Sequence, residues 1–134
     1  MKKYLLMAIV ASGVLFAQNT ETVDLKKNMQ EMEVALAVIQ RGFLYNDATL
    51  VEGGVRSLQA KAKYIEPPQG KDAEVFGESN TYSFKYAKKQ SSKIAVLSDE
   101  IWSNFKKGEK YTAMSRYKET LKQCLACHKK IRKR

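Results

Sequence analysis

Both cysteines and the single histidine of this 134-residue chain lie within five consecutive positions near its C-terminal end. They are Cys124, Cys127 and His128, in the pattern Cys-x-x-Cys-His that is typical of covalent attachment of c-type haem. Each thiol can add to one vinyl group of the porphyrin, and the adjacent imidazole can bind the iron from one face. Separations of three and four residues place all three side chains on one side of a helix. The spacing therefore predicts one covalently bound haem c, with His128 as an axial iron ligand.

The same residue types could also support three other kinds of site. A zinc site normally takes four nitrogen or sulfur ligands, and this motif supplies only three. A thioredoxin-like redox pair is typical of a strand followed by a helix, and the sequence shows no strand pattern here. A disulfide between Cys124 and Cys127 would close a loop of a few residues and would constrain the unfolded chain little. A haem-free helical interaction module with this disulfide remains as a hypothesis from another functional class.

The second axial position of the iron can be narrowed by elimination, because no second histidine exists. Met114 lies fourteen residues before His128, about 21 Å along one helix, and so cannot reach the opposite face of the same iron. Met29 and Met32 lie on the core-facing stripe of an earlier helix, where methionine commonly fills the core. Either could supply a thioether ligand, which would raise the haem potential. We expect Met29 first and Met32 second, with Lys26 or an open iron as the remaining alternatives.

Four amphipathic helices are expected to position the motif, because apolar residues recur at separations of three and four along most of the chain. Asn46 and Asp47 break the first helix and can cap the second, and Gly108 is a suitable end signal for the third. Both prolines fall in a long connection at 66–80. The predicted helices span residues 23–45, 48–64, 81–107 and 109 to nearly the C-terminus. This order predicts an all-α, antiparallel four-helix bundle with the haem attached near the C-terminus of the fourth helix.

The same spacing predicts which side chains face the core. In the second helix, Gly53 and Gly54 would each lower the stability of the helix by about 1 kcal/mol relative to alanine. Such glycines are tolerated where a bulky group packs close to the backbone. The predicted core faces consist, in chain order, of Leu25, Met29, Met32, Leu36 and Ile39; Leu50 or Val51, Val55, Leu58 and Ala62; Ala87, Gln90, Ile94, Leu97, Ile101 and Phe105; and Tyr111, Met114, Tyr117, Leu121, Leu125 or Cys124, His128 and Ile131.

Residues 1–17 have the order of parts of a secretory signal peptide. Two lysines give a cationic start, residues 4–16 are mostly apolar but too few for a membrane span, and Ala17 offers a cleavage site. An uncleaved membrane anchor is the alternative interpretation. The mature domain would comprise residues 18–134, and the sequence predicts that it is exported.

The chain is strongly basic, with 24 Lys and Arg against 14 Asp and Glu and a formal net charge of +10. A charge of this sign suits nucleic acid, an anionic membrane surface or an acidic protein. Export argues against nucleic acid, so an acidic redox protein partner or a bound anionic cofactor is expected. No set of residues indicates a catalytic nucleophile or general base, so the sequence predicts that the protein is not an enzyme.

The chain resembles the class II c-type cytochromes, the family of cytochrome c-prime and cytochrome c-556. The resemblance lies in the motif near the C-terminus, in the ending Cys-His-Lys-Lys-Ile-Arg at 127–132, and in residues 42–58, where Asp47-Ala48 leads into the second helix. It covers the whole mature chain. It implies a monohaem four-helix bundle that exchanges single electrons with redox protein partners in the periplasm. Homodimers formed through the first two helices are common in this family.

The two branches of the family differ at the sixth iron position. The c-556 branch has a methionine ligand from the first helix and transfers electrons. The c-prime branch leaves the iron five-coordinate behind an apolar residue and binds small gases such as nitric oxide or carbon monoxide. Counting back from Asp47 without gaps places the family's distal position near Leu25 or Lys26, about one turn before Met29. An iron covered by Leu25 would favour gas binding, and a helix shifted by one turn would bring Met29 to the iron.

Overall fold

The computed structural model describes residues 24–65 and 84–132, which form four α-helices. The predicted signal peptide at 1–17 and the predicted connection at 66–80 lie outside the described residues. The helices are α1 (Leu25–Tyr45), α2 (Ala48–Ala62), α3 (Phe84–Lys106) and α4 (Lys110–Arg132), and a short 3-10 turn, Lys63–Ile65, extends α2. Each helix matches its prediction to within a few residues.

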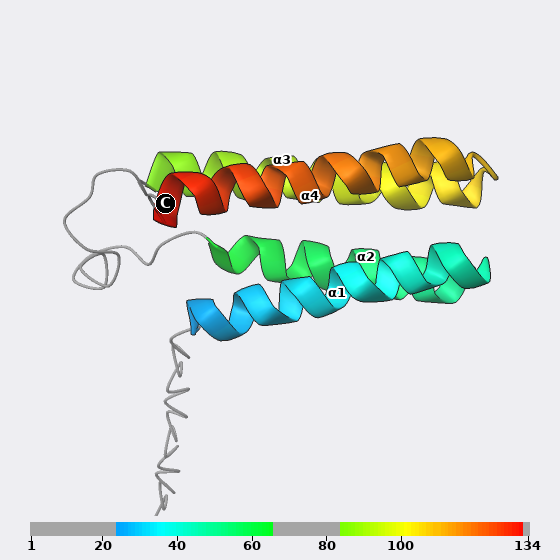
Figure 1. The fold of residues 1–134 in the computed structure, drawn as a ribbon, viewed down its shortest axis with the longest axis horizontal. Helices are drawn as coiled ribbons and strands as arrows, with labels where there is room; N and C mark the ends of the chain where they lie inside the picture. Colours follow the sequence, from blue (N-terminus) through cyan, green and yellow to red (C-terminus); the bar gives the residue numbers. More distant parts are fainter. Residues whose placement is uncertain (1–23, 66–83, 133–134) are drawn as a thin grey trace, which may run out of the picture.

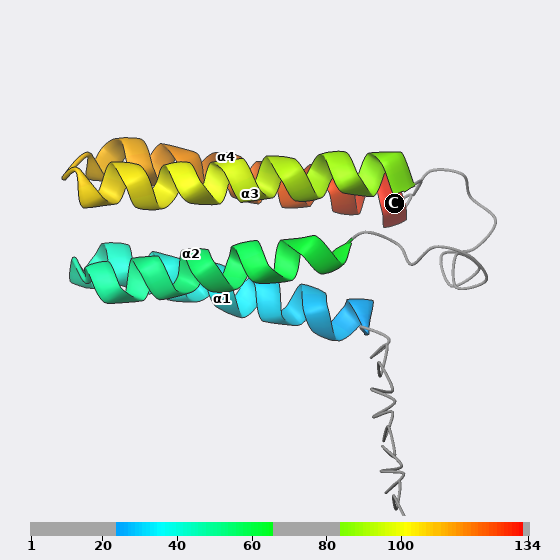
Figure 2. The ribbon, with the colours of Figure 1, turned by 180° about the vertical axis from the view of Figure 1, so that it is seen from behind.

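The helices alternate in direction and pack as two pairs. Figures 1 and 2 show α1 beside α2 in one layer and α3 beside α4 in the other. Close backbone approaches join α1 to α2, α2 to α3 and α3 to α4. The start of α1, the end of α2, the start of α3 and the end of α4 all lie at one end of the bundle (Figure 1). The predicted all-α, antiparallel four-helix bundle is therefore confirmed.

The predicted helix boundaries are confirmed at both short links. Asn46 ends α1 with a left-handed backbone (φ 53°), and the Asp47 carboxylate accepts from the backbone N–H groups of Thr49 and Leu50 at 2.8 and 3.1 Å. Gly108 follows α3 with φ 84°, a conformation that glycine adopts without steric cost. These caps turn the chain sharply, so successive helices run side by side in opposite directions.

The two adjacent glycines of α2 have different surroundings. A Cβ atom added at Gly54 would lie 2.6 Å from Ile39 Cγ1 and 2.9 Å from the Ala35 carbonyl oxygen, both in α1. A Cβ atom added at Gly53 would meet nothing within 4 Å. Of these two glycines, only Gly54 packs closely against another helix. The absence of a side chain at this position allows the backbone of α2 to lie against α1.

These two positions provide a matched test of the α1–α2 packing. Gly54→Ala should lower the free energy of unfolding by about 1–3 kcal/mol, because the new methyl group must displace packed atoms of α1. Gly53→Ala should raise it by about 0.5–1 kcal/mol, because alanine is favoured in an open helical position. Urea unfolding followed by circular dichroism would measure both. Equal stabilisation by the two substitutions would contradict the close approach at Gly54.

The core faces of the first three helices agree well with the sequence prediction. All six predicted positions of α3 are buried, and Val51 rather than Leu50 is the buried alternative in α2. In α1 the predicted stripe is buried from Met32 onward, whereas Leu25 and Met29 are half-buried. Within residues 24–65 and 84–132, no helix combines the length and apolar composition of a membrane span.

The predicted core face of α4 is wrong at Tyr111, Met114 and Leu121, and of the alternatives Leu125 and Cys124 it is Cys124 that packs against the core. The side chain of Ile131 lies outside the described residues. Tyr111 and Leu125 are 88% and 67% exposed, and Met114 and Leu121 are also exposed. The buried positions are Ala113, Thr120, Gln123 and Cys127. Small and polar side chains therefore make up most of the buried face of α4, although Tyr117 also packs against the core.

Candidate functional site

The Cys-x-x-Cys-His motif lies in the last turns of α4, at the bundle end where α1 and α3 begin (Figures 1 and 2). Cys127 is buried, with 6% of its surface exposed, whereas Cys124 and His128 are half-buried. Both cysteines are free thiols. The structure therefore presents two unlinked thiols and one imidazole on adjacent turns of a single helix.

Cys127 faces α3. It forms a small buried cluster with Ala87, against which Tyr86 packs. Burial raises the pKa of the Cys127 thiol, while a hydrogen bond donated by the Tyr86 hydroxyl and the nearby Lys130 cation oppose this shift. Burial also raises the pKa of Tyr86, and Cys127 contributes to the rise. The Lys130 ammonium lies 4.1 Å from the Tyr86 ring centroid, so Tyr86 lies between the motif and a cation of the same helix.

Cys124 faces the main core rather than the small cluster. It packs against the same group of buried side chains that includes Met32 and against which Met29 also packs. Burial raises the pKa of the Cys124 thiol, and the neighbouring Cys127 adds to the rise. Burial likewise raises the pKa of Tyr117, with a contribution from Cys124. The two cysteines thus pack against different groups of buried side chains.

The candidate sixth ligands lie in different surroundings. Met32 is 4% exposed and is part of the main core, whereas Met29 is half-buried at the edge of that core. Leu25 is also half-buried, and Lys26 is exposed in the first turn of α1. Met114 is 47% exposed on α4, fourteen residues before the motif histidine. The α1 candidates lie within the first eight residues of α1, and α1 begins at the bundle end that carries the motif (Figure 1).

Side chains rather than close backbone packing connect α1 with α4. The Tyr117 hydroxyl donates to the Leu36 carbonyl oxygen at 3.2 Å, and the Phe43 and Tyr117 rings meet edge to face with centroids 5.6 Å apart. Tyr117 precedes Cys124 by seven residues, and Leu36 and Phe43 lie in the second half of α1. Toward the motif, Figures 1 and 2 show the start of α1 diverging from the α3–α4 layer. At the bundle end that carries the motif, α1 therefore lies farther from the α3–α4 layer than at the other end.

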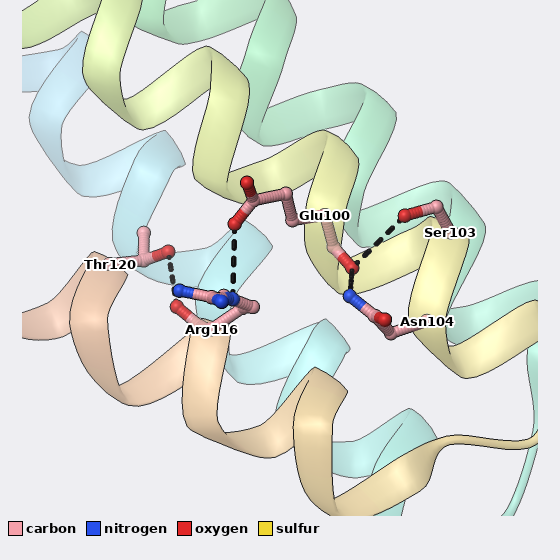
Figure 3. Close-up of polar contacts among 5 residues, drawn as sticks. All are labelled: Glu100, Ser103, Asn104, Arg116 and Thr120. Atoms are coloured by element: carbon pink, nitrogen blue, oxygen red, sulfur yellow. Dashed lines mark hydrogen bonds and ion pairs between the residues drawn. The ribbon is translucent and has the colours of Figure 1, made fainter.

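Polar contacts, one of them buried, link α4 to α3. The side-chain amide of Gln123, the residue before Cys124, donates to the side-chain oxygen of Gln90 in α3, and both residues are buried. Farther along, Arg116 of α4 pairs with Glu100 of α3 at 3.1 Å (Figure 3). The sequence prediction placed Gln90 in the core but did not place Gln123 there. Gln123 was missed because a polar residue is ordinarily expected at the surface.

Figure 3 also shows how the ion-pair region is supported. The backbone carbonyl oxygen of Glu100 accepts from the side chains of Asn104 at 2.6 Å and Ser103 at 3.3 Å. On α4, the Thr120 hydroxyl donates to the Arg116 carbonyl oxygen at 2.9 Å. These bonds satisfy the polar groups along the α3–α4 contact, so α4 can bury small and polar residues there at little cost.

The glutamine pair can be tested by a double-mutant cycle. Gln90→Leu or Gln123→Leu alone should lower the free energy of unfolding by about 1–3 kcal/mol, because each leaves a buried amide without its partner. The double variant should lose less than the sum of the two single losses, because no unpaired amide remains. Chemical unfolding of all four proteins would measure the coupling. Additive losses would show that the two amides do not interact.

The donor set fits a covalently attached porphyrin. Two free thiols at a separation of three residues suit two thioether bonds, and the imidazole one residue later can bind the iron. A porphyrin supplies four nitrogen ligands itself, so the protein needs to add only one or two. Within residues 24–65 and 84–132, no group of three or more His, Cys, Asp or Glu side chains is placed to hold a metal ion.

No protein-family model matches the chain, and neither a curated protein nor a solved structure is significantly similar to it. Membership of the class II cytochromes therefore remains a prediction from the motif and the order of the helices. The fold itself rests on the structure.

Proposed function

We propose that this chain is an exported, monohaem c-type cytochrome of class II type that carries single electrons between protein partners. Haem c would be held through Cys124 and Cys127, with His128 as an axial iron ligand. The observation that carries the proposal is the pair of free thiols and the imidazole on adjacent turns of α4. Export rests on residues 1–17, which lie outside the described part of the chain.

The bound group would supply an iron that alternates between the ferric and ferrous states. The chain's own residues would fix its position and its surroundings. Cys127 packs with Ala87 of α3 and Cys124 packs against the main core, so two bonds would hold the group at two separate points. Half-burial of His128 keeps the imidazole close to the protein interior, where the ligand is shielded from competing water.

Met29 is the best-supported sixth ligand among the candidates. Met32 already fills the core, so moving its side chain to an iron would leave a cavity. Met29 lies at the core edge and packs on the same cluster as Cys124, so its flexible side chain can turn without opening the core. A thioether at this position supports electron transfer rather than gas binding. An iron covered by Leu25 is the alternative, and it corresponds to a nitric oxide- or carbon monoxide-binding protein.

Covalent attachment can be tested by intact mass measurement of the mature, exported protein. The chain should carry the mass of one haem, because both thiols are free to form thioethers. Cys124→Ala with Cys127→Ala should carry none after denaturation, and each single variant should lose most of its haem. Met114→Leu, a substitution at an exposed position of the same helix, serves as the control and should retain it. A native chain that matures with a disulfide at these cysteines would refute the proposal.

The sixth ligand can be tested by optical spectra of three matched variants. Met29→Leu should abolish the ferric methionine–iron charge-transfer band and open the ferrous protein to carbon monoxide. Met32→Leu and Met114→Leu should retain the band, because the former fills the core and the latter is beyond reach. If the unsubstituted protein already binds carbon monoxide and lacks the band, the iron is open and the gas-binding alternative replaces electron transfer.

A further inference from the structure

The exposed side of α4 near the motif carries positive charge that the described part of the chain leaves largely unneutralised. α4 contains seven Lys or Arg residues and only one acidic residue, Glu119. Two of these cations pair with carboxylates, and two others lie over aromatic rings. Within residues 24–65 and 84–132, no carboxylate lies within ion-pair distance of Lys118 or Lys129.

Two exposed leucines lie between these two cations. Leu121 is 38% exposed and Leu125 is 67% exposed. Leu121 follows Lys118 by three residues, and Leu125 precedes Lys129 by four, so these side chains lie along one side of the helix. We call Lys118, Leu121, Lys122, Leu125 and Lys129 the α4 patch. Protein docking surfaces commonly have an apolar centre surrounded by polar and charged residues, and the α4 patch has this composition.

We propose that the α4 patch is the docking site for a protein whose contact face carries carboxylates around an apolar centre. The choice of partner follows from charge complementarity, because Lys118 and Lys129, which have no carboxylate within ion-pair distance among the described residues, attract carboxylates and steer their approach. A membrane surface fits less well. A helix that lies in a membrane inserts a wide apolar face, whereas the opposite face of α4 is already buried in the bundle and the patch offers only two leucines.

The α4 patch overlaps the turns that carry the motif. Leu121 precedes Cys124 by three residues, and Leu125 precedes His128 by three. A protein bound to the patch would therefore lie against the part of α4 that holds the candidate site. A role of this contact in electron exchange rests on the proposed function. The docking itself depends only on the charge and exposure of the patch.

The test uses the purified, mature chain and a small acidic flavodoxin as the probe. Binding is measured by calorimetry at low and high salt, and the contact is mapped by nuclear magnetic resonance shifts of the cytochrome-like chain. The shifts should concentrate at residues 118–129. Lys118→Gln with Lys122→Gln and Lys129→Gln should weaken binding at low salt by about tenfold or more, because rim lysines dominate the attraction there.

A matched variant on α3 separates position from net charge. Lys88→Gln with Lys89→Gln and Lys93→Gln removes the same charge from exposed positions of another helix and should weaken binding by less than about threefold. For the apolar centre, Leu125→Ala should weaken binding at high salt, where the lysines are screened. Its control is Val96→Ala, at a 58% exposed position of α3, which should have no effect.

Several outcomes would overturn the docking proposal. These are no binding at low salt, shifts that map elsewhere, equal losses from the two triple variants, or attachment to phosphatidylglycerol vesicles through the patch while flavodoxin fails to bind. The haem content of the same sample separates the two proposals. Specific binding by a haem-free chain would refute the proposed function and leave the docking site intact, whereas a haem-loaded chain that does not bind would refute the docking site alone.

Discussion

The packing of α4 against α3 is the constraint on which the candidate site depends. The buried Gln90–Gln123 amide contact holds one face of α4 against α3, and the exposed Arg116–Glu100 ion pair lies farther along the same contact. In this arrangement Cys127 is buried while Tyr111, Met114, Leu121 and Leu125 of the same helix are exposed. A helix rotated to bury its leucines would move the motif away from α3. The polar contacts therefore favour the arrangement that turns the motif inward, at the expense of apolar burial elsewhere on α4.

Much of the fold could be predicted from the sequence because local signals agreed with one another. Asn46, Asp47 and Gly108 mark the two short links, and the structure shows the left-handed backbone or side-chain caps expected of them. The core face of α3 is correct at every predicted position because its apolar residues keep a regular spacing. The identity and spacing of the motif residues also came from the sequence, since three side chains separated by three and four residues share one helix face whatever the surroundings.

The remainder could not be predicted because it depends on contacts between helices. Periodicity assigns the largest apolar residues to the core, but α4 buries Ala113 and Thr120 and exposes Leu125. Gln123 is polar, and only its partner across the α3–α4 contact explains its burial. The difference between Gly53 and Gly54 likewise depends on where α1 crosses α2. In each case the sequence of one helix lacks the information that its neighbour supplies.

The two cysteines of the motif pack against different groups of buried side chains. Cys127 packs with Ala87 of α3, while Cys124 packs on the core that also contacts Met29 of α1.

The central claim is that one haem is bonded to these cysteines, and acidified acetone extraction tests it most directly. Extraction removes haem that is held only by coordination and leaves thioether-linked haem on the chain. The account predicts that the mature protein retains one haem per chain through extraction; a colourless protein, or haem that passes entirely into the solvent, would contradict it.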